Sequence, residues 1–281
     1  MDFSLFLPET YLLLMALFFF FQSLWKSSAK LNQGIAFFLS GLGVIIALFT
    51  LNRSGDLFFQ SYRVDLFSQT FKCLISLGLF LVIILGQELK SIDERLQPEF
   101  FMFLCLSSLG LMLMVSSVEL LTLFIAMELS SYSLYILIPL RKQTNGGQME
   151  AAIKYIIFGA TATGIMLFGM SYIFGVTQST YLVDILKKLP ALLGQPIAII
   201  GLILLLCGFF FKLAVVPFHF WAPDVYQGAA NETTSFIATM PKLAAVALLL
   251  RMVSLAGIEA VDLIKILQEK NSNLEQNIFF L

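Results

Sequence analysis

Residues 201–217 read Gly-Leu-Ile-Leu-Leu-Leu-Cys-Gly-Phe-Phe-Phe-Lys-Leu-Ala-Val-Val-Pro. The run is long enough to cross most of a bilayer, because the hydrocarbon core takes about 20 helical residues. It nevertheless contains Lys212, and His219, the one histidine of the chain, follows shortly after it. A charge at that depth costs roughly 2.5 to 3.5 kcal/mol on insertion scales. A lysine retained in spite of this cost indicates a functional site inside a membrane.

Pro217 predicts a break in the same helix. Proline lacks the backbone donor, and its ring clashes with the preceding turn. A membrane tolerates an interrupted helix only where protein or a water-filled cavity satisfies the freed backbone groups. Transporters place their polar sites beside such broken helices. The sequence therefore predicts an internal polar site around Lys212.

The composition as a whole is that of an integral membrane protein. Hydrophobic residues make up 59% of the 281 residues and charged residues only 12%. This leaves too little polar surface to cover a water-soluble globule of this size. The net charge of -1 and the lack of a basic run exclude a general electrostatic attraction to nucleic acid.

Eight apolar runs have the length of a membrane span. They fall at about residues 5–25, 33–51, 71–89, 100–117, 120–140, 151–175, 196–220 and 233–256. The runs do not alternate between polar and apolar residues, as strands of a membrane β-barrel would. The predicted fold class is therefore an all-α membrane protein with about eight transmembrane helices. The first run is interpreted as a retained span and not as a cleaved signal.

Most polar residues fall in the predicted connections between these spans. Loops are predicted at residues 53–65, 87–99, 141–150 and 177–188. Assigning alternate loops to opposite faces places Lys72 with the loop charges of one face. The basic residues then divide almost evenly between the faces, so the positive-inside rule does not give the orientation.

Three further ionisable residues lie in apolar runs, namely Glu128, Lys154 and Lys242. Glu128 lies about 12 Å into its predicted helix, too deep to reach the membrane surface. Together with Lys212 and His219, these residues could form a proton path. Several also have a structural interpretation: a neutral, hydrogen-bonded Glu128, an interfacial Lys154, and a histidine that only ends a helix.

No pattern for binding a cofactor is visible in the sequence. Cys73, Cys105 and Cys207 lie in apolar runs without paired spacing, so we expect them to pack in the core. One histidine and few membrane carboxylates cannot build a standard metal site. A glycine-rich nucleotide motif is also lacking. We therefore expect neither a metal nor a redox cofactor on this chain.

Four stretches, in the same order along the chain, resemble one family. They are Leu121-Thr-Leu-Phe-Ile-Ala-Met-Glu-Leu, Glu150-Ala-Ala-Ile-Lys-Tyr-Ile-Ile-Phe-Gly-Ala, Phe211-Lys-Leu-Ala-Val-Val-Pro-Phe-His-Phe-Trp-Ala-Pro-Asp-Val-Tyr-Gln-Gly and Pro241-Lys-Leu-Ala-Ala. These stretches closely resemble the antiporter-like subunits of respiratory complex I, and among them the subunit called N in bacteria and subunit 2 in mitochondria. After Gly228 the chain reads Ala-Ala-Asn-Glu-Thr-Thr, where the family usually has a Pro-Thr-Pro-Val-like stretch.

The resemblance implies three segments. Residues 1–99 would form three N-terminal transmembrane helices, and residues 100–256 an antiporter-like five-helix unit with a broken seventh helix. Residues 257–281 would be a polar link and the start of a truncated ninth helix. Family members continue with a second unit of inverted topology. The resemblance therefore implies a missing C-terminal half, and we expect this chain alone not to be a self-sufficient transporter.

The resemblance also implies roles for the buried charges. Glu128 would be the glutamate at a subunit boundary, and Lys154 the lysine of the sixth helix. Lys212 would be the central lysine of the broken helix, with His219 just beyond the break. Lys242 would be the connecting lysine of the eighth helix. We expect Lys212 to face the protein interior at the break, with Lys154 or Glu128 nearby.

The implied function is proton translocation as a membrane-arm subunit of NADH:quinone oxidoreductase (complex I). The chain would lie in a bacterial plasma membrane or a mitochondrial inner membrane. Its partners would be the other membrane-arm subunits, the lipid bilayer and the missing half. Other subunits would hold NADH, FMN, iron-sulfur clusters and quinone. Two alternatives stay open: a stand-alone cation/proton antiporter or membrane hydrogenase subunit, and a structural scaffold whose buried charges only pair.

Overall fold

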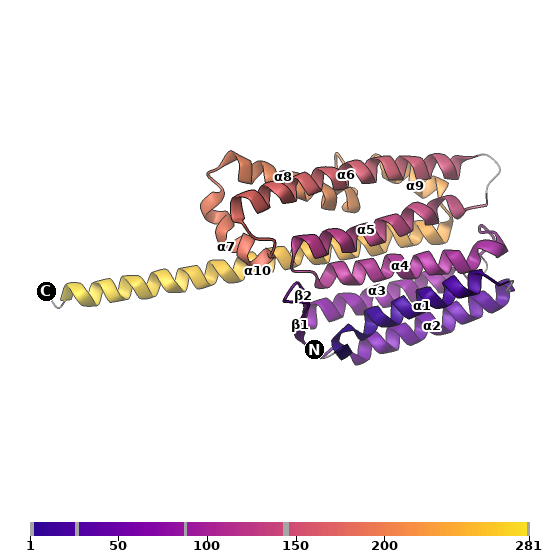
Figure 1. The fold of residues 1–281 in the computed structure, drawn as a ribbon, viewed down its shortest axis with the longest axis horizontal. Coiled ribbons are helices and arrows are strands. Elements are labelled where there is room, and N and C mark those ends of the chain that lie inside the picture. Colours follow the sequence, from indigo (N-terminus) through magenta and orange to yellow (C-terminus); the bar gives the residue numbers. More distant parts are fainter. Residues whose placement is uncertain (1–2, 26–27, 87–88, 143–145, 280–281) are drawn as a thin grey trace.

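The computed structural model describes residues 3–25, 28–86, 89–142 and 146–279, with side chains described from residue 4 to residue 257. Helices make up nearly all of the regular structure (Figure 1). The main elements are α1 (Leu7–Ser23), α2 (Ala29–Phe49), β1 (Gly55–Leu57), β2 (Tyr62–Val64), α3 (Leu66–Leu85), α4 (Gln97–Ser116), α5 (Leu120–Leu137), α6 (Gly147–Thr177), α7 (Leu182–Leu192), α8 (Pro196–Leu213), α9 (Trp221–Gly228) and α10 (Asn231–Phe279). Short 3-10 helices lie at Phe3–Phe6, Glu94–Leu96 and Ile138–Leu140.

Eight helical stretches of the described chain are long and apolar enough to cross a membrane. They are Ser4–Ser23, Ala29–Phe49, Leu66–Leu85, Glu94–Ser116, Leu120–Leu140, Gly147–Thr177, Pro196–Leu213 and Asn231–Gly257. The predicted all-α membrane fold is confirmed.

The third span begins earlier than predicted, which corrects the position of one lysine. The Asp65 carboxylate accepts a hydrogen bond from the Ser68 backbone N–H, and the Asp65 N–H donates to the Ser68 hydroxyl. This reciprocal pair is a capping box, and it starts α3 at Leu66 instead of residue 71. Lys72 therefore lies inside a membrane-spanning helix. Its placement among the loop charges was wrong.

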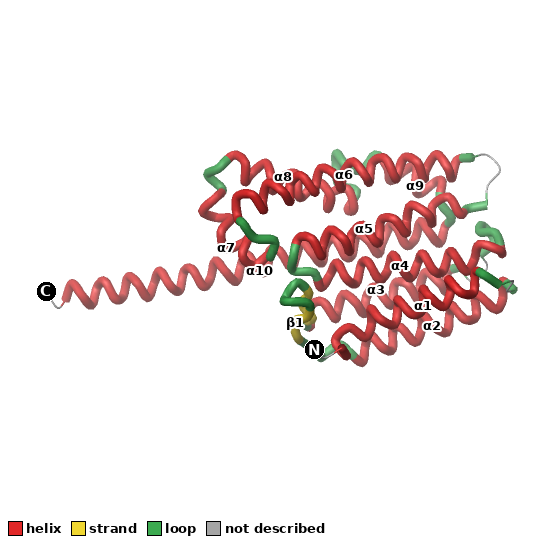
Figure 2. Tube along the Cα trace, in the orientation of Figure 1, coloured by secondary structure: helices red, strands yellow, loops and turns green. Residues whose placement is uncertain are grey.

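The helices lie side by side, with α4 near the centre of the bundle (Figures 1 and 2). The span that contains α4 is the most buried of the eight, with 72% of its most apolar stretch of residues buried inside the protein. α4 packs against α1 and α3 on one side and along α5 on the other, while α6 pairs with α8. The apolar core is thus continuous from the three N-terminal helices to the helices that carry the predicted site.

Two glycines allow neighbouring helices to approach at backbone distance. A Cβ atom on Gly110 of α4 would lie 2.6 Å from the backbone nitrogen of Ser130 and 2.8 Å from the carbonyl oxygen of Ala126, both on α5. A Cβ atom on Gly169 of α6 would overlap the backbone of Leu205 on α8. Small residues at such positions are the usual means of close helix packing in membranes.

Two of the predicted loops contain a hairpin or a helix that lies outside the eight spans. Residues 53–65 include the antiparallel hairpin of β1 and β2, which lies beside the N-terminus (Figure 2). Residues 177–188 include the start of α7, an amphipathic helix that buries Leu182 and Ile185 and exposes Lys187 and Lys188. Its charged residues face out, which explains why the sequence resembles a polar loop.

α10 continues as one helix through the residues predicted to form a polar link. It runs from Asn231 to Phe279, and its C-terminal part projects beyond the bundle in Figure 1. The part up to Gly257 is the eighth span. The division of the chain into three functional segments stays a prediction.

Candidate functional site

The predicted break of the seventh span is confirmed. α8 ends at Leu213, four residues before Pro217, where the proline ring would clash with the carbonyl of a continued helix. Ala214 adopts the left-handed conformation with φ of 55°. The indole N–H of Trp221, the first residue of α9, donates to the Phe211 carbonyl at 3.1 Å. This bond satisfies one of the carbonyls that the end of the helix leaves free.

Lys212 lies one residue before the end of α8, and its side chain points into the protein. Only 2% of its surface is exposed. Its Nζ donates a 2.9 Å hydrogen bond to the hydroxyl of Ser131 on α5. That hydroxyl donates in turn to the Met127 carbonyl at 2.8 Å. The amine therefore reaches from the broken helix to α5.

Glu128 lies on α5, three residues before Ser131, and is 7% exposed. Its carboxylate interacts electrostatically with Lys212. Its Oε1 accepts no hydrogen bond from the part of the chain that the structure describes. A carboxylate so placed stabilises the charged form of a buried amine. The structure thus places Glu128 near Lys212, as expected.

Three aromatic side chains pack around the break. Tyr155 of α6, Phe211 of α8 and Trp221 of α9 are all buried, and their ring centroids lie 4.9 to 5.6 Å apart. Aromatic pairs at such distances add about 0.5 to 1.5 kcal/mol beyond their buried area. These ring contacts hold α8 and α9 against α6 on both sides of the break.

Lys154 makes its polar contacts with residues other than Lys212 and Glu128. Its Nζ lies 2.7 Å from Glu150 Oε1, one turn earlier on α6, and 2.7 Å from Asp224 Oδ2 on α9. The Lys154 side chain is 37% exposed and lines a polar pocket of about 260 Å³. This geometry is that of the interfacial alternative. It also connects α6 to the segment just beyond the break.

His219 and Lys242 lie in separate surroundings. His219 is half-buried within the break, its ring centroid 4.6 Å from that of Phe220, and its Nδ1 has no partner among the described residues. Lys242 of α10 is half-buried, with Nζ 5.7 Å from the ring centroid of Tyr226. Tyr226 stacks edge-on against Trp221 at 5.9 Å. Aromatic rings therefore lie between Lys242 and the break.

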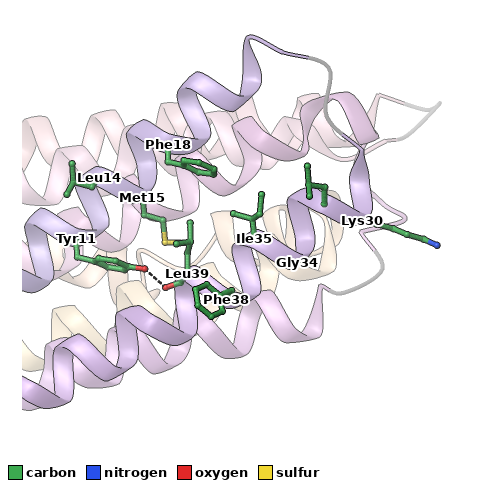
Figure 3. A pocket seen from close by; sticks show the side chains of 10 residues that line it. Tyr11, Leu14, Met15, Phe18, Lys30, Gly34, Ile35, Phe38 and Leu39 are labelled. Atoms are coloured by element: carbon green, nitrogen blue, oxygen red, sulfur yellow. Dashed lines mark hydrogen bonds between the residues drawn. The ribbon is translucent and has the colours of Figure 1, made fainter.

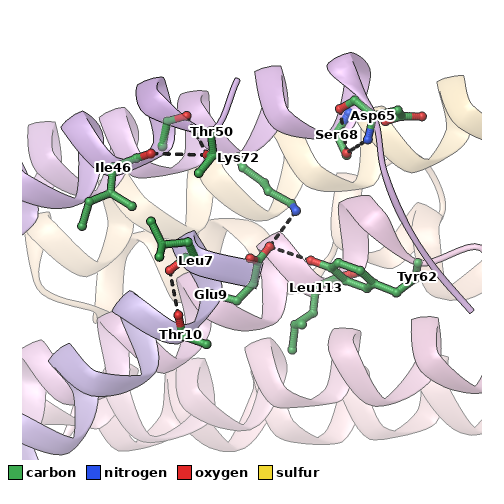
Figure 4. A network of polar contacts seen from close by, with 12 residues as sticks. Leu7, Glu9, Thr10, Ile46, Thr50, Tyr62, Asp65, Ser68, Lys72 and Leu113 are labelled. Atoms are coloured by element: carbon green, nitrogen blue, oxygen red, sulfur yellow. Dashed lines mark hydrogen bonds and ion pairs between the residues drawn. The ribbon is translucent and has the colours of Figure 1, made fainter. Parts of the chain in front are cut away.

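The structure reveals a second buried charge pair, which the sequence reasoning missed (Figure 4). Lys72 Nζ of α3 lies 2.8 Å from Glu9 Oε1 of α1, and both side chains are 0% exposed. The Tyr62 hydroxyl donates to the same carboxylate oxygen at 2.5 Å. Burial first, and the Glu9 carboxylate second, raise the pKa of Tyr62 well above its usual range. The capping sequence from Asp65 to Ser68 was the signal that could have placed Lys72 well inside its helix instead of at the start.

A further charged contact joins α10 to α3. The Arg251 guanidinium donates to both carboxylate oxygens of Asp65, at 2.8 and 2.9 Å. The Arg251 side chain is 3% exposed and that of Asp65 35%. Burial acts to raise the pKa of Asp65, but hydrogen bonds from Arg251 and Ser68 outweigh it and hold that pKa below its usual value.

No metal site is apparent in the part of the chain that the structure describes. Among these residues, no three His, Cys, Asp or Glu side chains lie close enough together to hold an ion. Cys105 and Cys207 are buried and Cys73 is half-buried, each as a free thiol.

Residues 117–268 match the family described as NADH:quinone oxidoreductase/Mrp antiporter, TM. The match covers more than half of the chain. The chain belongs to this family. It is 50% identical over 258 residues to NADH-quinone oxidoreductase subunit N 2 of Opitutus terrae, which covers 91% of the chain and 54% of that relative. It is 44% identical over 268 residues to the protein of the same name from Syntrophobacter fumaroxidans, which covers 95% of the chain and 57% of that relative.

Solved structures of other membrane complexes share the fold. A chain of respiratory complex I from Thermus thermophilus superposes with a TM-score of 0.72 at 30% identity, covering 87% of this chain and 52% of that one. A chain of an archaeal membrane-bound sulfane sulfur reductase gives 0.76 at 22% identity, covering 89% and 53%. The chain spans about half the length of the relatives it matches. Like the antiporter-like family it belongs to, it is a multi-pass integral membrane protein.

Proposed function

We propose that the chain acts in a proton-translocating membrane-arm subunit of NADH:quinone oxidoreductase, complex I. The observation that carries the proposal is Lys212, which is buried at a helix break, bonded to Ser131 and electrostatically coupled to Glu128. Relatives that are 50% and 44% identical bear the name NADH-quinone oxidoreductase subunit N 2. The redox reaction would take place elsewhere in the complex, with NADH, FMN, iron-sulfur clusters and quinone on other subunits.

The geometry supports a proton switch at Lys212. A buried ammonium is stabilised by a nearby anion, and it loses its proton more readily when that anion is neutralised or moves away. Glu128 supplies the anion from α5, and the Ser131 hydroxyl accepts a hydrogen bond from the amine. A change in the charge of Glu128 would therefore be followed by proton release or uptake at Lys212.

The other predicted residues would extend the path from this pair. Asp224 lies on α9, beyond the break, so its ion pair with Lys154 responds to any shift of that segment. Lys242 lies across Tyr226 and Trp221 from the break. We assign Lys154 and Lys242 to the two sides of Lys212, with His219 at the break itself.

The test compares variants in the assembled complex reconstituted into vesicles. Lys212→Met removes the proton-binding amine but retains a flexible apolar chain, and Glu128→Gln keeps shape and hydrogen bonds but not charge. We expect Lys212→Met to abolish most proton translocation per NADH oxidised, and Glu128→Gln to lower that ratio by more than half while lowering assembly less.

Lys187→Met is the matched control, because Lys187 is exposed on α7. It should leave the proton ratio unchanged. Proton translocation at the wild-type ratio in an assembled Lys212→Met complex would identify a structural scaffold and refute the proposal.

A stand-alone antiporter is the second candidate. The family description includes the Mrp antiporter, and a chain of the Mrp complex from Dietzia has the same fold with a TM-score of 0.71 at 20% identity, covering 88% of this chain and 48% of that one. Purification of the chain from its membrane distinguishes the two. A co-purifying NADH-oxidising arm favours complex I, and an isolated homo-oligomer favours the antiporter.

A further inference from the structure

α1 and α2 enclose an apolar groove that takes no part in the proposed proton path (Figure 3). The groove has a volume of about 530 Å³. Leu14 and Phe18 line it from α1, and Phe38 lines it from α2. One end is closed where the Tyr11 hydroxyl donates to the Leu39 carbonyl at 2.7 Å. The groove is open along the outer side of the bundle, where both helices are membrane spans.

The other end of the groove meets a basic pocket. Lys30 lines both cavities, and in Figure 3 its amine points away from the apolar groove, past the start of α2. The second cavity has a volume of about 790 Å³. Its charged lining consists of Lys30, Lys90, Asp93, Glu94, Arg95 and Lys142, four basic against two acidic side chains, which gives a net charge of +2. Lys30, Arg95 and Lys142 form no ion pair with any described residue.

Together the two cavities match the shape of a phospholipid. The charged cavity lies where the spans end and suits a headgroup, and the apolar groove runs along the spans and suits an acyl chain. From Lys30 to Leu39 the groove follows α2 for about 14 Å at 1.5 Å per residue. The apolar side chains of the groove suit an acyl chain, and the positive charge of the adjoining cavity suits an anionic headgroup more than the apolar helix of another subunit. Basic pockets at the membrane surface select anionic headgroups.

We propose that the α1–α2 groove and the adjoining basic pocket form a binding site for one anionic phospholipid. Its phosphate is held by Lys30, Arg95 and Lys142, and one acyl chain lies between α1 and α2. The site involves neither Lys212 nor Glu128, so it holds whether or not the proposed function does.

Gly34 gives a way to fill the groove without disturbing the fold. It lines the groove, and a Cβ atom added to it would meet no atom within 4 Å. Gly34→Leu therefore places a side chain in the acyl position, and leucine also favours the helix. Gly164 of α6 has the same open surroundings, so Gly164→Leu is the matched control.

The experiment uses the assembly that contains the chain, reconstituted in phosphatidylcholine vesicles. A small fraction of the lipid is phosphatidylglycerol or phosphatidylcholine with a photoreactive group in the acyl chain. After irradiation, labelled peptides are mapped. In the wild type we expect labelling of α1 and α2 to be at least about fivefold stronger from phosphatidylglycerol, the ratio expected for one basic residue near a surface. Lys30→Gln should lower this preference about fivefold.

Gly34→Leu should remove the labelling of the groove by both lipids, whereas Gly164→Leu and Lys187→Gln should behave as the wild type. Equal labelling by the two lipids in the wild type would indicate unspecific boundary lipid. Absence of label, with a neighbouring subunit seated on α1 and α2, would indicate a protein occupant. Either result, or undiminished labelling in Gly34→Leu, would overturn the proposal.

Discussion

Two buried lysines of this chain are stabilised in different ways. Lys72 makes a direct 2.8 Å ion pair with Glu9, and both side chains are fully buried. Lys212 instead donates a hydrogen bond to the neutral hydroxyl of Ser131. The Glu128 carboxylate influences the charge of Lys212 without forming a direct ion pair with it. A directly paired ammonium is held in its charged form, whereas one bonded to a hydroxyl can change its protonation state when the nearby charge changes. The arrangement at Lys72 suits a structural role, and the arrangement at Lys212 suits proton transfer.

The structural role of the Glu9–Lys72 pair gives a stability prediction. Lys72→Met leaves the Glu9 carboxylate buried without its cation, and breaking a buried pair in this way costs about 3 to 5 kcal/mol. We expect a large loss of resistance to unfolding, measured by titrating the purified protein with sodium dodecyl sulfate and following helix content.

The double variant Glu9→Met, Lys72→Met is the control for this prediction. Replacing both charges by apolar side chains removes the unpaired charge, and such replacements are often neutral. The double variant should therefore be more stable than Lys72→Met alone. A double variant that is less stable than the single one would show that the pair contributes net stability beyond cancelling its own burial.

At the scale of elements, apolar run length and proline position predicted most of the fold. Eight runs gave eight spans, and Pro217 gave the break after Leu213. The errors arose where local polarity and secondary structure disagree. Residues 182–192 have exposed lysines yet form α7, because the helix buries only one face. α3 begins at Leu66 because a cap, and not hydropathy, fixes its start.

The pairings of the site could be predicted only in part. Hydropathy showed that Lys212 and Glu128 are buried, but it does not show which residues of another helix they face. Lys212 meets Ser131 across 81 residues of sequence, and Lys154 meets Asp224 across 70. Such contacts depend on the angle at which helices pack, which is set by close approaches such as that of Gly110 to α5.

The Gly110 contact predicts that α4 positions the helix that carries the site. Any side chain at Gly110 would overlap the α5 backbone at Ser130, so Gly110→Ala should push α5 away at a cost of about 1 to 3 kcal/mol. Because Glu128 and Ser131 lie on α5, we expect proton translocation to fall more than the amount of assembled complex. Gly164→Ala, with open space around it, should change neither. Normal translocation in Gly110→Ala would show that α5 does not depend on this contact.

For the whole molecule, α10 is a second element, besides α4, that contacts both the N-terminal helices and the region of the site. Near its start, the Ser91 hydroxyl donates to Glu232 at 3.0 Å. Further along, Lys242 lies over Tyr226, and Arg251 binds Asp65 at the start of α3. α10 therefore contacts both α9, through Tyr226, and the start of α3, through Asp65.

The Asp65–Arg251 contact predicts a stability that depends on pH. The folded-state pKa of Asp65 is lowered, so its contribution is fully present above the unfolded value of about 4 and is lost as the pH falls through the lower folded value. Asp65→Asn retains a capping side chain but removes the charge. Because Asp65 is 35% exposed and solvent screens it, we expect Asp65→Asn to lose only about 1 to 2 kcal/mol of stability.

Thermal unfolding of the Asp65→Asn variant should show this loss at pH 7 and a smaller difference from the wild type below about pH 4. Asp56→Asn breaks an ion pair in which neither side chain is buried, so it should change little. If Asp65→Asn were no less stable than Asp56→Asn at pH 7, α10 would be held to α3 by apolar packing alone.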